Sequence, residues 1–467
     1  MKYEEIVAAI QNIVNTPMRD FPPEKLNEFV KIYEQKHLKS KELYERAKKI
    51  IPGGVEHNLA FNFPFPLASK KVDGCYLWTV DDVKLTDYLM NGGPTILGHN
   101  YPPHTDKIVE VIREQGSCHG ITSEYEVLAA EALQKHFPSC EQIRWLQSGT
   151  EADMLAIRVA RVFTGKKWII KIGGSYHGWS DQLVYDLHVP GTKTLESHGI
   201  PKPIYKFIES VKPNDIEALR ELFKERKRKI AAVLIEPMGG ESGAIPTRPG
   251  FNKEVEELCR ENNALLIFDE VVCAFRLHMG GGQAYYGVKP DLSVFGKIVG
   301  HGYPSAAALG GRSDIMQYVA AGVGAGRKRA YCGGTLAANP LTCAAAYWAI
   351  KLVEETNATE KAGKAATRLV TGLNAVFKKY DLPWICYNFN ATVHMQTSAV
   401  MGLDMDNPKH FPEIKPRKEF MEHLGAALVS QDIISVAGSR FYTCMQHTDD
   451  VVDDTIAKMD FICQAVE

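Results

Sequence analysis

Residues 265–271 read LLIFDEV, and residues 295–302 read FGKIVGHG. The first stretch is an apolar run that predicts a buried strand with the carboxylate of Asp269 at its tip. The second stretch places Lys297 between an apolar run and a cluster of glycines, where a lysine is poorly placed for solvation. If both runs are strands of one sheet, their ends bring an amine and a carboxylate to the same edge.

An amine and a carboxylate at two strand ends suit a site for pyridoxal phosphate (PLP). The Lys297 amine would form a Schiff base with the aldehyde of PLP, and Asp269 would keep the pyridine nitrogen protonated. Taken alone, a lysine such as Lys297 is more often a solvated surface residue, and Asp269 could be a helix N-cap. The rest of the chain must therefore decide between these interpretations.

Composition narrows the class of protein. At 467 residues the chain is too long for one simple core and predicts two or three structural units. With 54 Lys and Arg against 56 Asp and Glu, the net charge of -2 indicates neither a nucleic-acid nor a membrane-surface partner. The 10 cysteines include no CxxC pair, so we expect reduced core thiols and no metal. An acidic N-terminus and the lack of a membrane-length apolar segment predict a cytoplasmic location.

The pattern of apolar residues predicts the organisation of the chain. Residues 1 to about 50 have helical spacing, broken at Pro22-Pro23, and short alternating runs between Leu67 and Leu89 predict a small antiparallel ribbon. From about 100 to 340, strand-like runs alternate with helical patterns, which predicts a mostly parallel sheet with helices on both faces. A long helical pattern follows Asn339-Pro340 and reaches about residue 380.

We therefore expect an α/β protein with three segments. Residues 1–95 would form N-terminal helices and part of a small domain, and residues 96–345 would form a large cofactor-binding domain. Residues 346–467 would complete the small domain at the C-terminal end of the chain.

Two further stretches could contact a phosphate or a flat ring. Ser148-Gly149-Thr150 opens a strong helical pattern, and a helix N-terminus binds phosphate through its N–H groups and its dipole. The same stretch could be a capping box, with Ser148 as N-cap and Glu151 three residues later. Tyr176-His177-Gly178 could stack an aromatic ring on a cofactor, although such a residue is more often a packing aromatic.

Other candidates stand where strands and turns end. Glu236, like Asp269, closes an apolar run, and ligands of open α/β sheets bind outside the carboxyl ends of the strands. Gly333-Gly334-Thr335 could be a second phosphate-contacting loop or merely a turn. Each of these signals is weak alone, and it is their order along the chain that carries information.

This order resembles that of the class III aminotransferases of PLP fold type I, and within them most closely the glutamate-1-semialdehyde 2,1-aminomutases. The resemblance runs from about Ser40 to the end of the chain. It implies a large domain with a mostly parallel, seven-stranded type of sheet, and a smaller α+β domain from the two terminal segments. The stretches that carry it are Leu43–Ala47, Pro52–Val55, Ser148–Ala152, Tyr176–Gly178, Phe268–Val271, Phe275–Arg276, Tyr286–Leu292, Gly296–Gly300 and Gly334–Leu336.

The resemblance also implies roles around the ring of PLP. Lys297 would hold the cofactor and move a proton between the substrate Cα and C4′. Asp269 would pair with the pyridinium nitrogen. Val271 would pack on one ring face and Tyr176 on the other, with His177 beside it among the cofactor-binding residues.

The same resemblance implies contacts farther from the ring. Ser148, Gly149 and Thr150 would hold the phosphate, and Glu236 would lie near the 3-hydroxyl side. Thr335 would reach the phosphate of a neighbouring subunit, which makes the expected partner a second copy of this chain in a homodimer with shared active sites.

The substrate side departs from the aminomutase pattern. No arginine stands between Val55 and Phe65, where the aminomutases carry one that receives the substrate carboxylate. His301 stands at a glycine position of that family and could touch a substrate or cap a turn. The basic stretch Gly322–Arg329 lacks P-loop spacing. It could be a flexible loop near the dimer interface, or Arg327 and Arg329 could replace the missing receptor.

These observations favour a PLP-dependent aminotransferase, which moves an amino group from an amine or amino-acid donor to a keto or aldehyde acceptor. Two alternatives stay open: an isomerase of the aminomutase type, and a PLP-dependent lyase that acts on an amine without an α-carboxylate. One fold type supports all three reactions. A non-enzymatic scaffold is disfavoured, because the lysine, the aspartate and both phosphate-contacting loops are present.

Overall fold

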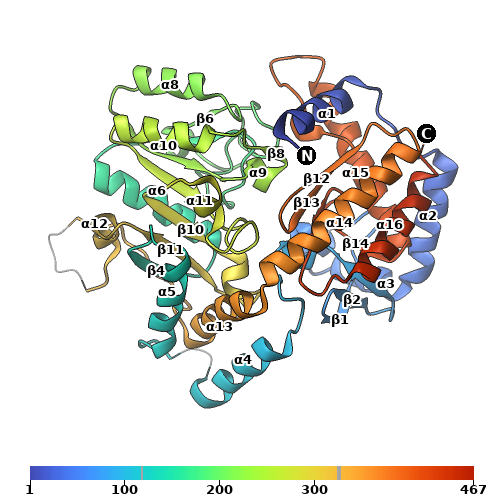
Figure 1. Cartoon of the computed structure of the whole chain (residues 1–467), viewed down its shortest axis with the longest axis horizontal. Helices are drawn as coiled ribbons and strands as arrows, with labels where there is room; N and C mark the ends of the chain where they lie inside the picture. Colours follow the sequence, from blue (N-terminus) through green and yellow to red (C-terminus); the bar gives the residue numbers. More distant parts are fainter. Residues whose placement is uncertain (61, 117–118, 323–327, 467) are drawn as a thin grey trace. The chain divides into compact units, whose positions relative to one another are not determined.

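The computed structural model describes residues 1–60, 62–116, 119–322 and 328–466. The chain folds into two compact units (Figure 1). Unit 1 comprises residues 1–101, 357–403 and 407–467, and unit 2 comprises residues 102–356 with 404–406. The two terminal segments thus share one unit, while a continuous central segment forms nearly all of the other. The boundaries at residues 95 and 345 stay predictions.

Unit 2 is built on a seven-stranded sheet with the spatial order β4-β11-β10-β9-β7-β5-β6. Strand β11 runs antiparallel to both of its neighbours, and the other adjacent pairs are parallel. The predicted α/β class and the mostly parallel sheet are therefore confirmed. The strands are β4 (Gln142–Leu146), β5 (Trp168–Ile172), β6 (Ile208–Val211), β7 (Ile230–Ile235), β9 (Leu265–Asp269), β10 (Leu292–Phe295) and β11 (Ala307–Gly311).

Helices cover both faces of this sheet. Strand β7 is buried along its whole length, and its alternate residues face opposite layers. Leu234 packs in the layer of helix α6, whereas Val233 packs in the layer of helices α8 and α10. The helices of unit 2 are α4 (Pro102–Gln115), α5 (Glu124–His136), α6 (Gly149–Thr164), α7 (Lys202–Tyr205), α8 (Ile216–Glu225), α9 (Gly240–Gly243), α10 (Phe251–Glu261), α11 (Gly281–Tyr286), α12 (Ser313–Met316) and α13 (Pro340–Thr356).

Unit 1 contains two small sheets and a separate apolar core. The predicted ribbon is the antiparallel set β1 (Ser69–Asp73), β2 (Tyr76–Thr79) and β3 (Lys84–Asp87), which β14 (Ile433–Ile434) extends in parallel. The second sheet is antiparallel, with strands β12 (Ile385–Phe389), β13 (Thr392–Gln396) and β15 (Arg440–Tyr442). The helices are α1 (Tyr3–Asn15), α2 (Pro23–Lys36), α3 (Leu38–Ala47), α14 (Ala358–Lys379), α15 (Ile414–Ser430) and α16 (Asp449–Cys463).

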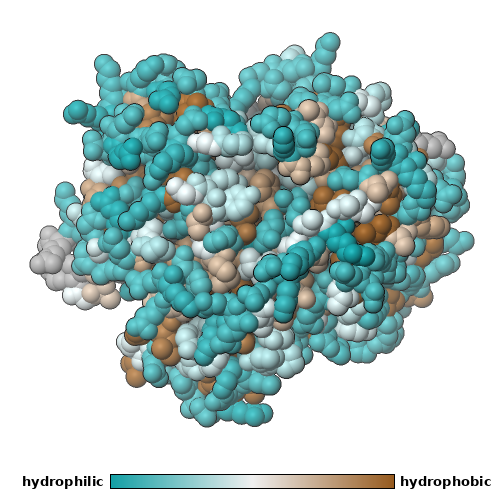
Figure 2. Space-filling view, viewed as in Figure 1, coloured by the Kyte–Doolittle hydropathy of each residue, from teal (hydrophilic) through white to brown (hydrophobic). Residues whose placement is uncertain are grey.

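Local residue chemistry explains where several elements begin and end. Helix α2 begins at Pro23, since a proline at the first helical position lacks only an N–H that would have no partner there. The helical pattern after Pro340 is two helices, because Asn357 adopts a left-handed conformation with φ 53° between α13 and α14. Among the described residues, no helix has the length and apolarity to cross a membrane. The face in Figure 2 is mainly hydrophilic, with small scattered apolar areas.

Candidate active site

Asp269 and Lys297 lie at the same edge of the unit 2 sheet. Strands β9 and β10 are adjacent and parallel, and Asp269 is in register with Val294. Asp269 is the last residue of β9, and Lys297 follows β10 after a single glycine. Lys297 is half-buried and has a left-handed φ of 50°, an uncommon conformation for a non-glycine residue that occurs often at functional sites. The sequence pattern placed both side chains at this edge.

The Asp269 carboxylate is buried and is held on both oxygens. Its side chain is 5 % exposed, and its Oδ2 lies 2.8 Å from Nδ1 of His177. Its Oδ1 accepts a hydrogen bond of 3.0 Å from the backbone N–H of Val271. An ionised carboxylate only accepts hydrogen bonds, so His177 donates through Nδ1. His177 therefore helps to hold the Asp269 carboxylate in place.

Three buried acids near this pair have a raised pKa. Burial, and then the charge of Asp269, raises the pKa of Glu236 to about 8. Burial raises the pKa of Glu270 to about 7, despite hydrogen bonds from Gly282 and Gln283. Burial also raises the pKa of Asp153 well above its usual range. A cation beside Asp269 would stabilise the ionised form of such acids, and a protonated pyridine nitrogen would supply one.

One buried cation of this region is Lys171 in strand β5. Its ammonium group donates to the carbonyl oxygens of Ser175 at 2.9 Å, Leu183 at 3.3 Å and Tyr185 at 2.9 Å. Burial lowers the pKa of Lys171 to about 8. The three acceptors lie in the loop that follows β5, so Lys171 fixes the segment that carries Tyr176 and His177.

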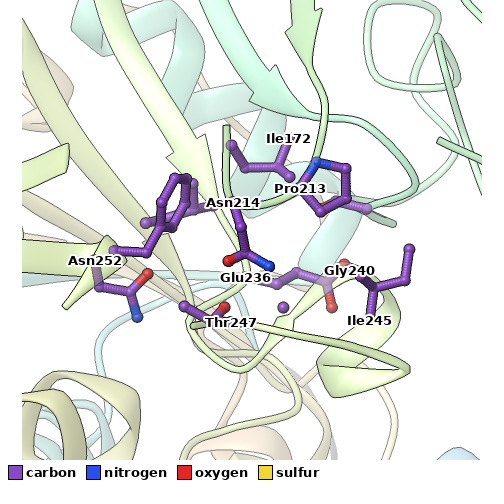
Figure 3. A pocket seen from close by; sticks show the side chains of 12 residues that line it. Ile172, Pro213, Asn214, Glu236, Gly240, Ile245, Thr247 and Asn252 are labelled. Carbon is purple, nitrogen blue, oxygen red and sulfur yellow. The ribbon is translucent and has the colours of Figure 1, made fainter. Parts of the chain in front are cut away.

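Glu236 supports the same loop from the end of β7. Its Oε1 accepts from the backbone N–H of Tyr176 at 2.8 Å and of Glu241 at 2.9 Å, and its Oε2 accepts from the hydroxyl of Ser242 at 2.7 Å. The Tyr176 side chain is 46 % exposed, which leaves its ring available to a ligand. Glu236 also borders a cavity of about 10 Å³. Figure 3 shows its side chain there with those of Asn214 and Thr247.

The N-terminus of helix α6 begins at the predicted position. Ser148 is the N-cap, and its hydroxyl accepts from the N–H of Glu151 at 3.3 Å. In a capping box the Glu151 carboxylate would accept from the N–H of Ser148. Here it accepts instead from the N–H of Gln147 at 3.0 Å. The capping interpretation is thus half right. The cap leaves other first-turn N–H groups of α6 to serve an anion.

Two loops lie close to this helix end. A Cβ on Gly149 would lie 3.0 Å from a methyl group of Val271. A Cβ on Gly178 would overlap Thr150, and Gly178 has a φ of 82°. Gly149 and Gly178 therefore allow the first turn of α6, which includes Thr150, to approach the loops that carry Val271 and His177. This close approach fits a cradle for a flat ring with a phosphate.

The remaining candidates lie at the margin of this group. Thr335 is exposed, and its neighbour Gly334 packs against the side chain of Gln147, next to Ser148. His301 is 5 % exposed and ends the short helical turn after Lys297, with its ring edge-to-face at 5.0 Å from that of His104. These contacts favour the turn-capping role for His301.

The basic stretch yields one described arginine. The guanidinium carbon of Arg329 lies 5.4 Å from the centre of the exposed Tyr331 ring. Arg327 lies outside the described residues.

The sequence patterns missed two buried groups, Asp153 and Lys171. Asp153 stands on the buried face of helix α6 beside Ala152, and Lys171 interrupts the apolar strand β5. A charged residue inside an apolar pattern was the signal that could have found both. The described cysteines are free and mostly buried, as expected.

Comparison with protein families gives one match over most of the chain. The model for aminotransferase class-III covers residues 61–384. Among curated proteins, the chain is 37% identical over 437 residues to a glutamate-1-semialdehyde 2,1-aminomutase from Ignicoccus hospitalis, covering 90% of this chain and 97% of the relative. It is 34% identical over 440 residues to the enzyme of that name from Methanocaldococcus jannaschii, covering 92% and 99%.

Solved structures give the same fold. An omega-transaminase from Sphaerobacter thermophilus superposes with a TM-score of 0.81 at 26% identity, over 91% of this chain and 97% of that one. A glutamate-1-semialdehyde-aminomutase from Pseudomonas aeruginosa, in complex with PMP, has a TM-score of 0.82 at 20% identity, over 98% of both chains. The predicted PLP fold type I is therefore confirmed.

Proposed function

The chain belongs to the class-III aminotransferase family of PLP-dependent enzymes, and from that premise we propose that it transfers an amino group between two substrates. The donor would be an amine or amino acid, and the acceptor a ketone or aldehyde. One observation supports this proposal: the residues that we propose to hold the cofactor are all present in the sequence, whereas residues 55–65 contain no arginine to receive a substrate carboxylate.

The proposed cofactor site uses residues at one edge of the unit 2 sheet. When bound, PLP supplies an aldehyde that condenses with amines and a ring that withdraws electrons from the neighbouring carbon. Asp269 would hold a proton on the ring nitrogen, and Val271 and Tyr176 would pack on the ring faces. The further residues proposed to hold PLP are Ser148, Gly149, Thr150, His177, Glu236, Lys297 and Thr335.

Lys297 is the proposed catalytic base and covalent anchor. Its Nζ would bond to the cofactor between turnovers and, when displaced by substrate, would move a proton between the substrate Cα and C4′. Thr335 would act on a second copy of the chain, and its exposure supports this role in a homodimer. The buried free thiols favour a reducing compartment such as the cytoplasm.

An aminomutase is the second candidate. The curated relatives at 34% and 37% identity carry that name, and the similarity extends over 90% or more of this chain. The missing arginine argues against the same substrate, because a guanidinium gives a carboxylate two oriented, charge-assisted hydrogen bonds. The two candidates differ in a measurable way: only a transferase needs an acceptor.

The test is a donor screen on the purified enzyme with PLP, run with and without a keto-acid acceptor. Product that forms only with acceptor, together with conversion of bound PLP to pyridoxamine phosphate by the donor alone, is the expected result. Turnover of glutamate-1-semialdehyde without acceptor would instead support the aminomutase. Elimination from an amine without acceptor would support a lyase.

The lysine assignment needs its own control. Lys297→Ala should lose the absorbance band of lysine-bound cofactor, whereas Lys289→Ala, which changes an exposed lysine of the same unit, should keep it. A bond to PLP that borohydride still reduces in Lys297→Ala would show that another amine holds the cofactor.

A further inference from the structure

Asp153, His177 and Asp269 form a buried group that extends behind the cofactor site. One ligating atom from each lies within 4.8 Å of the other two. The side chains are 1%, 0% and 5% exposed, so water from the bulk does not reach them. They come from helix α6, the loop after β5 and the end of β9. Polar groups this deeply buried are stabilised mainly by hydrogen bonds with one another.

The hydrogen bonds of this group place its protons. Asp269 accepts through Oδ2 from Nδ1 of His177 and through Oδ1 from the N–H of Val271. With its proton on Nδ1, a neutral His177 carries a lone pair on Nε2. Nε2 of His177 and Oδ1 of Asp153 are both buried and have no hydrogen-bond partner in the structure. A proton on the Asp153 carboxyl would complete this set, because its O–H could then donate to Nε2 through one buried water.

We propose that Asp153, as a neutral carboxylic acid, is a positioning residue that holds His177 in the tautomer protonated on Nδ1. In that tautomer His177 donates to Asp269, and Asp269 stays ionised to face the ring nitrogen of PLP. Asp153 thus acts on the cofactor through His177. This inference rests on the proposed role of Asp269.

The charges around Asp153 support the neutral form. Burial, followed by the negative charges of Asp269 and Glu236, raises the pKa of Asp153 well above its usual range, while Lys171 opposes that shift. Burial lowers the pKa of His177, which keeps the imidazole neutral, although Asp269 opposes this. A neutral acid that donates to a neutral imidazole satisfies both orphaned atoms without adding a buried charge.

Three such side chains could also ligate a metal ion, and the charges argue against it. A divalent cation would sit beside the protonated ring nitrogen that Asp269 is proposed to hold. Two cations competing for one carboxylate would weaken each other's binding in a buried site. A proton on Asp153 meets the same hydrogen-bonding need without that repulsion.

The test measures the bound cofactor, with no substrate present. The variants are Asp153→Ala and Asp153→Asn, and Met154→Ala on the same helix, a more exposed position, serves as the control. The readouts are the dissociation constant of PLP and the pH midpoint of the absorbance change of bound PLP. The amide of asparagine can still donate to Nε2, so Asp153→Asn should stay within about twofold of wild type in PLP affinity.

Asp153→Ala should behave differently. We expect PLP to bind about tenfold more weakly and the absorbance midpoint to rise by roughly half a pH unit or more. The reason is electrostatic. Without Asp153, the ring nitrogen of PLP would be protonated less often. It would then repel less strongly the proton on the nitrogen that joins PLP to the protein, so that proton would leave at a higher pH.

Several outcomes would overturn the inference. Wild-type affinity and midpoint in Asp153→Ala, with only a lower melting temperature, would make Asp153 a packing residue. Equal damage in the Asn and Ala variants would exclude the donor role. Loss of PLP on dialysis against EDTA would indicate that a metal ion, rather than a proton on Asp153, completes this group. If Asp269→Ala leaves the midpoint unchanged, the proposed role of Asp269 itself fails, which separates that failure from one confined to Asp153.

Discussion

Each unit of the molecule contains a buried aspartate at a strand end that pairs with a histidine. In unit 1, Asp87 ends β3, its Oδ2 lies 2.8 Å from Nε2 of His99, and its Oδ1 accepts from the N–H of Met90 at 2.8 Å. In unit 2, Asp269 ends β9 and makes the corresponding pair with His177 at 2.8 Å. Locally the two arrangements are nearly the same.

Their surroundings differ. Neither Asp87 nor His99 leaves a buried side-chain nitrogen or oxygen without a partner among the described residues, whereas His177 leaves Nε2 unpaired. Burial, and then the charge of Asp269, raises the pKa of both Glu236 and Asp153. A carboxylate and imidazole pair is therefore not a functional site by itself. Raised pKa values of neighbouring acids and an unpaired His177 Nε2 are what distinguish the proposed site from the pair in unit 1.

Replacing the two aspartates one at a time is the strongest test of whether the two pairs differ in function. Asp269→Ala should weaken PLP binding by about 10²–10³-fold, because losing one partner of a buried ion pair costs roughly 3–5 kcal/mol. Titration of the apoenzyme with PLP, followed by absorbance, measures this effect. Asp87→Ala is the matched control and should keep its PLP affinity. Equal losses in the two variants would mean that the pairs are not functionally different.

Asp87→Ala should instead destabilise the fold. It removes a charged acceptor from a buried histidine and from the N–H of Met90, which we expect to cost about 3 kcal/mol of unfolding free energy. Guanidinium unfolding followed by circular dichroism measures the loss. Release of PLP from this variant at denaturant concentrations where it is still folded would contradict the structural role.

The raised pKa of Glu236 predicts a pH dependence of stability. Burial raises the pKa of Glu236 from 4.5 to about 8, so in PLP-free protein its stabilising contribution is full below pH 4.5 and declines as pH rises towards 8. Glu236→Gln cannot ionise, so between pH 5 and 8 it should lose about 3–4 kcal/mol less stability than wild type. Urea unfolding across this range gives the slope. The exposed control Glu221→Gln should parallel wild type, and a parallel slope in Glu236→Gln would refute the prediction.

The smallest effect is expected where a short ion pair is exposed. Lys135 and Glu354 approach to 2.6 Å on the surface of unit 2. Because solvent screens exposed charges, Lys135→Ala should change the melting temperature by about 1 °C or less. Differential scanning calorimetry measures this shift. A shift comparable with that of Asp87→Ala would show that the distance between two charges, rather than their burial, determines how much an ion pair stabilises this protein.

The sequence predicted the sheet edge well, for a physical reason. Apolar runs that end at Asp269 and before Lys297 mark strands, and parallel strands converge at one edge whatever their side chains. The α/β class, the mostly parallel sheet and the ribbon after Leu67 followed from periodicity in the same way. The left-handed Asn357 was missed, because helical periodicity continues on both sides of it.

The hydrogen-bonded surroundings of the site could not be predicted. A helical pattern shows that Asp153 lies on a buried face, but not which loop meets that face. Lys171 bonds to backbone carbonyls, which every residue possesses, so no sequence motif marks its partners. The carboxylate of Glu151 accepts from the N–H of Gln147 rather than from that of the N-cap, Ser148. These two N–H groups are adjacent in the chain, and sequence spacing does not show which of them the carboxylate will bind.

The three carbonyl bonds of Lys171 have a consequence for chemical selectivity. An amine attacks an aldehyde through a lone pair, so a lysine that gives each ammonium proton to a carbonyl must first break one bond. Lys171 lies within strand β5, whereas Lys297, the lysine proposed to react, follows strand β10. Burial lowers the pKa of Lys171 to about 8, and a lowered pKa is common in nucleophilic lysines. The backbone carbonyls nevertheless hold the protons of this ammonium group. If Lys297 is the reacting lysine, as proposed, the peptide carbonyls of this loop would keep the Lys171 amine from competing for the aldehyde.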